Sequence, residues 1–393
     1  MRGMSSPHST LPVLIAGGGI GGLAAALALS RIGWPSIVLE QARRFGEVGA
    51  GIQISPNVFK MFEVLGIREA IERIAVFPDC LSIRDAIGGE QVMQTQFGTE
   101  FVARYRYPYG VIYRPDLLDT LLQACARSPL IALHPGTKVV DYEDQGEVVA
   151  VQTETADRLA GRALIGADGL WSRIRERIVG YGKPRVAGHI AYRAVLPIEQ
   201  APEHARIHRV TLWAGPKIHL VHYPLRRGEL LNLVAVFHSD RYEEGWDTYG
   251  DPQELRKKFA QARPEVQQLL DLIEAWRMWV LCDREPVRNW SDGRVTLLGD
   301  AAHPTLQYLA QGGCMAIEDA VVLARALAAS GGDVARAFVE YQEARVLRTA
   351  RVQLTSRFVG DYVYHVRGVA AELRNQMLMN LSRESMAWLY DGV

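Results

Sequence analysis

Residues 13–22, Val-Leu-Ile-Ala-Gly-Gly-Gly-Ile-Gly-Gly, decide the fold together with the segments on either side of them. The apolar run 12–16 is suited to a buried parallel strand. After the glycines, residues 23–31 are rich in alanine and leucine, which is typical of a helix. A second apolar run, 36–39, ends in Glu40. The chain is therefore predicted to open with a strand–helix–strand unit.

Three of the glycines, Gly17, Gly19 and Gly22, have the Gly-x-Gly-x-x-Gly spacing of a dinucleotide-binding turn. The first permits the tight turn after the strand. The second lets the backbone approach a pyrophosphate, and the third lets the helix pack closely on the strand. The helix N-terminus then offers free N–H groups to phosphate, and Glu40 can bind the ribose hydroxyls of adenosine. The unit predicts dinucleotide binding without distinguishing FAD from NAD.

Two further motifs each place an aspartate where an apolar strand ends. Asp168 lies in Gly-Ala-Asp-Gly after residues 163–165, and Asp300 lies in Gly-Asp-Ala-Ala-His-Pro after residues 295–298. Ligands of open α/β sheets bind at this edge, where an aspartate can hold ribityl or ribose hydroxyls. Each motif alone could be a turn with a helix cap. The three motifs together, in this order, favour FAD.

The strand–helix alternation is interrupted in the middle of the chain. Residues 190–237 alternate apolar and polar side chains repeatedly, as expected for antiparallel strands of a separate sheet, and 137–155 reads as a hairpin. Helices are predicted over residues 114–126, 252–276, 313–329 and most of 333–393. The expected FAD-binding domain has two parts, residues 1–180 and 286–357. The inserted sheet domain is expected over residues 181–285, and a helical tail over 358–393.

The composition argues against several classes of protein. Lys+Arg and Asp+Glu both number 44, which gives no support to nucleic-acid binding or a polybasic membrane patch. The uncharged stretch 11–29 is interrupted by five glycines, so it is not expected to span a membrane. The four cysteines form no Cys-x-x-Cys pair, which indicates neither a metal site nor a disulfide framework. A cytoplasmic protein is expected.

On these motifs, residues 13 to about 347 resemble the single-component flavoprotein aromatic hydroxylases, which include p-hydroxybenzoate and salicylate hydroxylases. The resemblance implies a Rossmann-like α/β FAD-binding domain with an inserted antiparallel-sheet substrate domain, a helical C-terminus and a homodimer. It implies that Glu40 binds the adenosine ribose, that the Asp168 motif serves both FAD and nicotinamide, and that Asp300 binds the ribityl chain. Arg114 matches the family arginine near the FAD phosphates, with a surface cation as the alternative.

The loop after the Asp300 motif departs from the family pattern Pro-x-x-Gly-Gln-Gly-x-Asn. Gln307 replaces the proline and Cys314 replaces the asparagine. By resemblance, the helix that follows points the backbone of Gly312, Gly313, Cys314 and Met315 at the flavin ring. Its dipole and N–H groups can stabilise negative charge there. We interpret the cysteine as a small packing residue rather than a reactive thiol.

Two segments, residues 219–228 and 306–310, resemble family members that hydroxylate 3-hydroxybenzoate. Alternate residues of a strand share a face, so His219 and Tyr223 should point the same way. The resemblance implies that both line the substrate pocket together with Gln307, although core packing is the alternative. His219 would accept the phenolic proton, Gln307 would hydrogen-bond the phenol oxygen, and Tyr223 would donate to the substrate.

The implied reaction converts a small phenolic acid, 3-hydroxybenzoate, to gentisate with O2 through a C4a-hydroperoxide of FAD. NADH is the expected reductant, and the sequence does not exclude NADPH. Salicylate 1-hydroxylase and 6-hydroxynicotinate 3-monooxygenase remain alternatives, as does a FAD-binding reductase without monooxygenase activity. A flavin halogenase is disfavoured because no Trp-x-Trp-x-Ile-Pro segment occurs.

Overall fold

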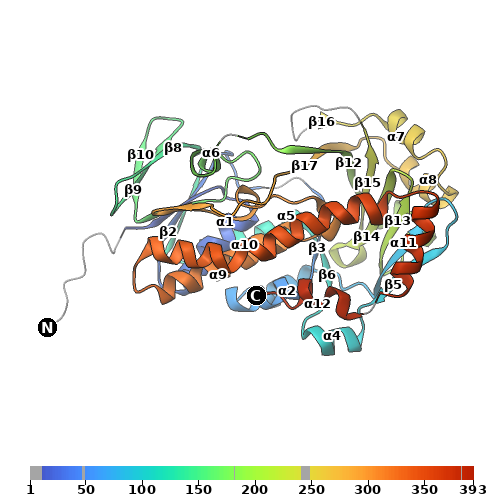
Figure 1. Cartoon of the computed structure of the whole chain (residues 1–393), viewed down its shortest axis with the longest axis horizontal. Coiled ribbons are helices and arrows are strands. Elements are labelled where there is room, and N and C mark those ends of the chain that lie inside the picture. The colour runs from blue at the N-terminus through green and yellow to red at the C-terminus, as the bar shows by residue number, and fades with distance from the viewer. Residues whose placement is uncertain (1–10, 47–48, 181, 240–247, 382) are drawn as a thin grey trace.

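The computed structural model describes residues 11–46, 49–180, 182–239, 248–381 and 383–393. Its elements form an elongated molecule with a β-sheet in each half (Figure 1). Among the described residues, no helix combines the length and apolar character needed to cross a lipid bilayer.

The first sheet has six strands and contains the opening unit. In spatial order they are β18 (Ser291–Asp292), β19 (Val295–Leu297), β11 (Ala163–Gly166), β1 (Val13–Ala16), β2 (Ser36–Glu40) and β7 (Ile131–Pro135). All neighbours pair in parallel except β18 and β19. Because Ala16 pairs with Gly166 and Gly166 with Leu297, the three strands that precede the motifs end side by side. The register therefore brings the three turns to one edge.

Helices cover this sheet as the apolar patterns predicted. α1 (Ile20–Arg31) is buried on nearly every side and packs against α9 (Gly312–Ala329) and α5 (Arg114–Ala126). A side chain at Gly22 would place its Cβ 1.9 Å from the carbonyl oxygen of Gly17, so only glycine lets the helix start this close to the turn. The predicted hairpin is also present, as β8 (Val139–Asp144) and β9 (Val149–Thr153), with β10 (Arg158–Gly161) beside them.

The second sheet has eight strands. In spatial order they are β16 (Thr248–Tyr249), β17 (Arg277–Asp283), β12 (Arg185–Pro197), β15 (Leu230–His238), β14 (Ile218–Leu225), β13 (Val210–Gly215), β4 (Cys80–Asp85) and β5 (Gln91–Gln96). All pairs are antiparallel except β4 with β13. Its two faces have separate apolar clusters. One packs against α7 (Pro252–Lys258) and α8 (Pro264–Asp271), and the other faces the first half of the molecule. Central strands such as β14 are consequently buried on both faces.

Two predictions about this region are wrong. The unit 1–180 does not belong only to the first sheet, because β4 and β5 join the second one and β3 (Gly51–Ile54) pairs with β6 (Gly110–Tyr113). The predicted helix 252–276 is two helices, α7 (Pro252–Lys258) and α8 (Pro264–Asp271), followed by β17. Proline disfavours helical geometry in the residue before it, so the chain breaks ahead of Pro264 and restarts.

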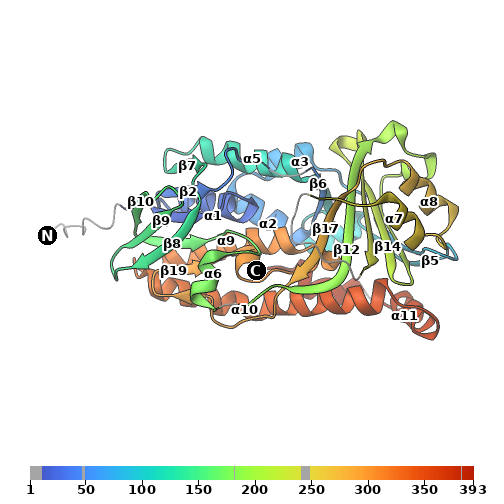
Figure 2. The same cartoon turned by 90° about the horizontal axis from the view of Figure 1, so that it is seen from above.

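The C-terminal part is helical, as predicted. α10 (Val334–Val359) runs from the first sheet to the second, a π-helical turn (Gly360–Tyr364) follows, and α11 (Val369–Met379) lies beside the second sheet (Figures 1 and 2). The chain then turns back, and α12 (Ala387–Tyr390) contacts α2 (Pro56–Leu65) of the first half.

Candidate active site

A cavity of about 850 Å³ lies between the edge of the first sheet that carries the three turns and the inner face of the second sheet. The loop 305–310 and residues of the C-terminal segment complete its wall. Apolar side chains from β4, β13 and β14 line much of the second-sheet end, whereas backbone and a few polar groups line the other end. The arrangement suits a polar nucleotide tail entering beside an enclosed apolar chamber.

The glycine turn has the shape that a phosphate group requires. Gly17 has a φ of +106°, and a Cβ there would lie 2.3 Å from the carbonyl oxygen of Ala167, so this turn and the Asp168 motif are in contact. A Cβ on Gly19 would meet nothing within 4 Å, and Gly19 borders the cavity. The space beside the start of α1 is therefore open for a ligand to approach the backbone.

Glu40 lies beside this turn, at the end of β2. One carboxylate oxygen accepts a hydrogen bond from the N–H of Gly18 and the other from the N–H of Ala42, each at 2.7 Å. The carboxylate is thus held in place by backbone, and its remaining lone pairs can accept hydrogen bonds from ribose hydroxyls. Its binding of the adenosine ribose stays a prediction.

The two motif aspartates differ in their surroundings. Asp300 borders the cavity, and no hydrogen bond of its carboxylate is found within the described residues. Burial raises the pKa of Asp300, and the neighbouring His303 and Arg114 oppose that rise. A carboxylate placed among protein groups but open to the cavity is a suitable acceptor for the hydroxyls of a ribityl chain, so this wall fits FAD.

Asp168 points elsewhere. Its carboxylate accepts a hydrogen bond from the N–H of Arg173 at 2.9 Å, at the start of α6 (Arg173–Ile178), and it is absent from the cavity lining, which includes its neighbours Ala167 and Gly169. The helix-cap alternative therefore describes its side chain, while the backbone of the motif faces the cavity. Arg114 borders the cavity, and its contact with the FAD phosphates stays a prediction.

The start of α9 brings two of its four predicted residues to the cavity. Gly312 and Gly313 border it, but the side chains of Cys314 and Met315 do not. The Met315 N–H already donates to the carbonyl of Gln311 at 2.8 Å, so it is not one of the free donors of the first turn. The Cys314 thiol is packed 3.7 Å from the hydroxyl of Ser55, and burial raises the pKa of Cys314 to about 11.

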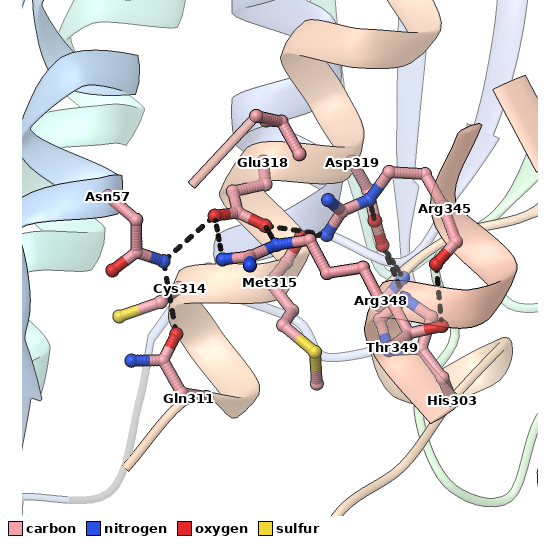
Figure 3. A network of polar contacts seen from close by, with 12 residues as sticks. Asn57, His303, Gln311, Cys314, Met315, Glu318, Asp319, Arg345, Arg348 and Thr349 are labelled. Carbon is pink, nitrogen blue, oxygen red and sulfur yellow. Dashed lines mark hydrogen bonds and ion pairs between the residues drawn. The ribbon is translucent and has the colours of Figure 1, made fainter. Parts of the chain in front are cut away.

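A buried polar network that the sequence analysis did not assign lies behind this helix (Figure 3). Both Glu318 and Asp319 are fully buried. Asp319 accepts hydrogen bonds from the Gly299 N–H at 3.0 Å and from Arg345 Nε at 2.6 Å, and its other contact is His303 Nε2 at 2.6 Å. The turn that carries Asp300 is consequently fixed to α9 and α10.

Glu318 fixes the loop before α9 in the same way. It pairs with Arg345 at 2.8 Å and Arg348 at 2.7 Å, and it accepts a hydrogen bond from the Asn57 amide at 2.8 Å. The same amide donates to Gln311 Oε1 at 3.1 Å (Figure 3). Two adjacent acids within a largely apolar helix were the sequence signal for this network, because buried carboxylates require partners.

At the other end of the cavity, His219 and Tyr223 share the inner face of β14, as predicted. His222 points to the opposite face, where its Nε2 accepts from the indole of Trp213 at 3.4 Å. His219 Nδ1 is hydrogen-bonded to His365 Nε2 at 2.7 Å. Burial lowers the pKa of His219 to about 3 and raises that of Tyr223, so both side chains are neutral near pH 7.

Gln307 also borders the cavity, and its partner was missed by the sequence analysis. Its side-chain oxygen accepts a hydrogen bond from the guanidinium of Arg193, on β12, which lines the same chamber. Burial lowers the pKa of Arg193 to about 10, so the group remains charged at neutral pH. A cation in the alternating segment 190–237 was visible in the sequence, but only the fold shows that it faces inward.

The geometry agrees with what related proteins show. Residues 10–353 match the sequence model described as the FAD binding domain. The chain is 45% identical to 3-hydroxybenzoate 6-hydroxylase of Polaromonas naphthalenivorans (strain CJ2), over 98% of this chain and 97% of that protein. It is 42% identical to 3-hydroxybenzoate 6-hydroxylase 1 of Aquipseudomonas alcaligenes, over 96% and 97% respectively.

Solved structures resemble this one along their whole length. The Klebsiella pneumoniae HpxO complex with FAD and uric acid superposes with a TM-score of 0.86 at 25% identity and covers 98% of both chains. A salicylate hydroxylase substrate complex has a TM-score of 0.83 at 26% identity and covers 98% of this chain and 96% of its own.

Proposed function

The chain belongs to the FAD binding domain family and is a flavoprotein aromatic monooxygenase, and on that premise we propose that it converts 3-hydroxybenzoate to 2,5-dihydroxybenzoate (gentisate). The relatives named for this reaction support the choice of substrate. The observation that supports this substrate is the chemistry of one wall of the cavity. That wall has a cation, Arg193, and two neutral polar side chains, His219 and Tyr223. A 3-hydroxybenzoate molecule offers a carboxylate to the first and a phenol to the second.

Arg193 is the proposed partner of the substrate carboxylate. It is the charged group on this inner sheet face, and a guanidinium can pair with both oxygens of a carboxylate. Its hydrogen bond to the Gln307 oxygen also orients that amide, because the oxygen is engaged and the NH2 group remains available. Gln307 would therefore donate to the phenol oxygen and hold the negative charge that develops there.

His219 is the proposed proton acceptor for the phenol. Its Nδ1 is engaged by His365, so its Nε2 is the nitrogen available to the cavity. Taking the proton raises electron density at the ring carbons ortho and para to the oxygen. Tyr223, kept protonated by burial, would donate to the substrate and help to select the para carbon.

Bound FAD supplies the redox chemistry by taking a hydride from a nicotinamide, proposed to be NADH, and by activating dioxygen. The protein's proposed contribution to that chemistry is electrostatic. The N–H groups of the first turn of α9, where Gly312 and Gly313 border the cavity, would stabilise negative charge on a bound flavin. The apolar wall from β4, β13 and β14 excludes water, which limits unproductive release of hydrogen peroxide.

Product analysis tests the proposal. FAD-loaded protein is incubated with NADH or NADPH, oxygen and, separately, 3-hydroxybenzoate, salicylate and 6-hydroxynicotinate, and products are identified by chromatography and mass spectrometry. Gentisate from 3-hydroxybenzoate, with faster turnover on NADH, is expected. Catechol from salicylate or 2,5-dihydroxypyridine from 6-hydroxynicotinate as the preferred product would assign a sister activity instead. Substrate-stimulated NADH oxidation that yields only hydrogen peroxide would support a reductase.

We also propose a cytoplasmic homodimer. The support for a dimer is the set of exposed apolar side chains on α10 and α11 that do not border the cavity, namely Leu347, Leu354 and Val369. The support for the compartment is four free cysteines and the need for a nicotinamide reductant. Light scattering during size-exclusion chromatography measures the mass, and a monomer at micromolar concentration would contradict the dimer.

A further inference from the structure

Three histidines from distant parts of the chain meet behind the substrate chamber. His189 comes from β12, His238 from the end of β15, and His365 from just after the π-helical turn. One ring nitrogen of each lies within 4.8 Å of those of the other two. We propose that they form a binding site for a divalent transition metal of the zinc type, with Asp361 as a fourth oxygen ligand.

The spacing of the nitrogens suits such an ion. His238 Nε2 and His365 Nδ1 are 3.0 Å apart, and the rings of His189 and His238 have centroids 4.1 Å apart. Zinc binds imidazole nitrogen at about 2.0–2.1 Å in tetrahedral geometry, which places ligand nitrogens roughly 3.4 Å from one another. Closing the group around an ion therefore needs side-chain movements on the order of 1 Å.

Each buried ligand is already oriented through its other nitrogen. His189 Nδ1 is hydrogen-bonded to the hydroxyl of Tyr308, and His365 Nε2 to His219 Nδ1 at 2.7 Å. This leaves Nε2 of His189 for the ion. Nδ1 of His365 now shares a hydrogen with His238 Nε2 at 3.0 Å, and a metal ion would take the place of that hydrogen between the two nitrogens. Metal-binding histidines are commonly held in this way, and such partners fix the ring and its tautomer.

The site opens toward solvent through its remaining groups. His238 is half-buried, and the Asp361 carboxylate, 57% exposed, lies 3.9 Å from His189 Nε2. An ion can thus enter without crossing the chamber.

The ligand atoms determine which type of ion the site prefers, and the surrounding charges limit the affinity. Lys217 and Lys258 lie near His238, Arg185 lies near His189, and Asp361 is the opposing acid. Three neutral nitrogens with one carboxylate attract zinc, nickel or copper, whereas magnesium and calcium require a set of oxygen ligands. The neighbouring cations should make binding weaker than at a structural zinc site, in the micromolar range.

A bound ion would also act on His219 through His365. With the metal on His365 Nδ1, the ring keeps its hydrogen on Nε2 and donates it to His219 Nδ1. Neutral His219 then carries its own hydrogen on Nε2 and cannot accept the phenolic proton. Inhibition of hydroxylation follows, and this consequence rests on the proposed function, whereas metal binding itself does not.

The test is equilibrium dialysis of tag-free, FAD-loaded protein against zinc chloride, with metal analysis of the protein. One zinc per chain is expected in the micromolar range. His238→Ala should weaken binding at least tenfold and Asp361→Asn by less. His208→Ala, which removes an exposed histidine outside the group, should leave binding unchanged. No stoichiometric zinc below millimolar concentration, or unchanged binding in His238→Ala, would overturn the site.

A second variant and a second readout keep the test decisive. If His238→Ala does not fold, His238→Gln preserves a polar side chain, and circular dichroism with retained flavin verifies its structure. Zinc should inhibit hydroxylation by the wild-type and His208→Ala proteins and should not inhibit His238→Gln. Stoichiometric zinc without inhibition supports the site and overturns its effect on His219. Because dialysis needs no turnover, it reports on the site even if 3-hydroxybenzoate proves not to be the substrate.

Discussion

His219 Nδ1 lies 2.7 Å from His365 Nε2, so the histidine that lines the chamber is held from behind by a second buried histidine. The pair joins a central strand of the second sheet to the chain that follows α10, segments 146 residues apart. With Nδ1 engaged, the ring can use only Nε2 toward a substrate. The contact therefore determines which nitrogen is available for proton transfer.

Replacing His219 with Asn should lower the rate of hydroxylation roughly 100- to 10,000-fold, because a positioned general base contributes about that much. Bound FAD should be retained, since the substitution lies away from the glycine turns. Rapid-mixing measurement of product formation per bound flavin checks this. His222→Asn, on the opposite face of the same strand, is the matched control and should keep near-normal turnover. Full coupled hydroxylation in the His219 variant would remove it from the mechanism.

Arg193→Met should raise the KM for 3-hydroxybenzoate roughly 10- to 100-fold, the value of a charge-assisted hydrogen bond. Arg193→Lys should lie between this variant and the wild type, because it keeps the charge but loses the planar fork. Steady-state kinetics with 3-hydroxybenzoate and the neutral 3-hydroxybenzamide separate charge recognition from general damage. If both substrates lost affinity equally, the carboxylate would bind elsewhere.

Asp319→Asn should destabilise the protein by about 3–5 kcal/mol, because it leaves Arg345 with an incomplete buried partner set. Urea unfolding followed by circular dichroism measures the loss, and weaker FAD retention should accompany it through the Gly299 contact. The control is Glu343→Gln. Glu343 lies on α10, as Arg345 does, and its exposed ion pair with Arg288 should cost less than about 1 kcal/mol to break. Equal effects of the two substitutions would contradict a structural role for the buried network.

The same network predicts how stability depends on pH. Burial opposes the charge of Asp319, but His303 and Arg345 outweigh it and hold the pKa of this carboxyl below its usual value. A depressed folded pKa stabilises the protein above the unfolded pKa, near 4, and this contribution is lost as the pH falls through and below that value. The difference in unfolding free energy between wild type and Asp319→Asn should therefore shrink between pH 6 and pH 3. A difference that grew on acidification would refute the assignment.

Cys314 should be unreactive in the native protein. Its thiol is buried, and burial raises its pKa to about 11, so almost no thiolate exists at pH 8. Iodoacetamide at pH 8 should modify Cys282, which is partly exposed, well before Cys314, as judged by peptide mass spectrometry. In urea, which unfolds the protein, Cys282 and Cys314 should be modified at similar rates. Rapid native modification of Cys314 with loss of activity would contradict its interpretation as a packing residue.

The sequence by itself determined the parts of this protein that depend on local geometry. Gly17 and Gly22 permit a tight turn and a close helix start that any Cβ would block, so this local geometry could be predicted from the sequence. The aspartate turns after β11 and β19 could also be predicted, because each motif directly follows its apolar strand in the sequence. Helix α5 also appeared with the predicted bounds. Resemblance added His219, Tyr223 and Gln307, and all three reach the cavity.

Only the tertiary structure decided which distant side chains meet. β4 joins the second sheet because β13 pairs with it in parallel, and nothing in its short apolar run records that partner. Arg193 becomes a chamber cation through the register of β12, and His189, His238 and His365 become a group only when three segments pack together. The physical reason is that turn geometry is set by neighbours in the chain, whereas burial, pairing and charge environment are set by neighbours in space.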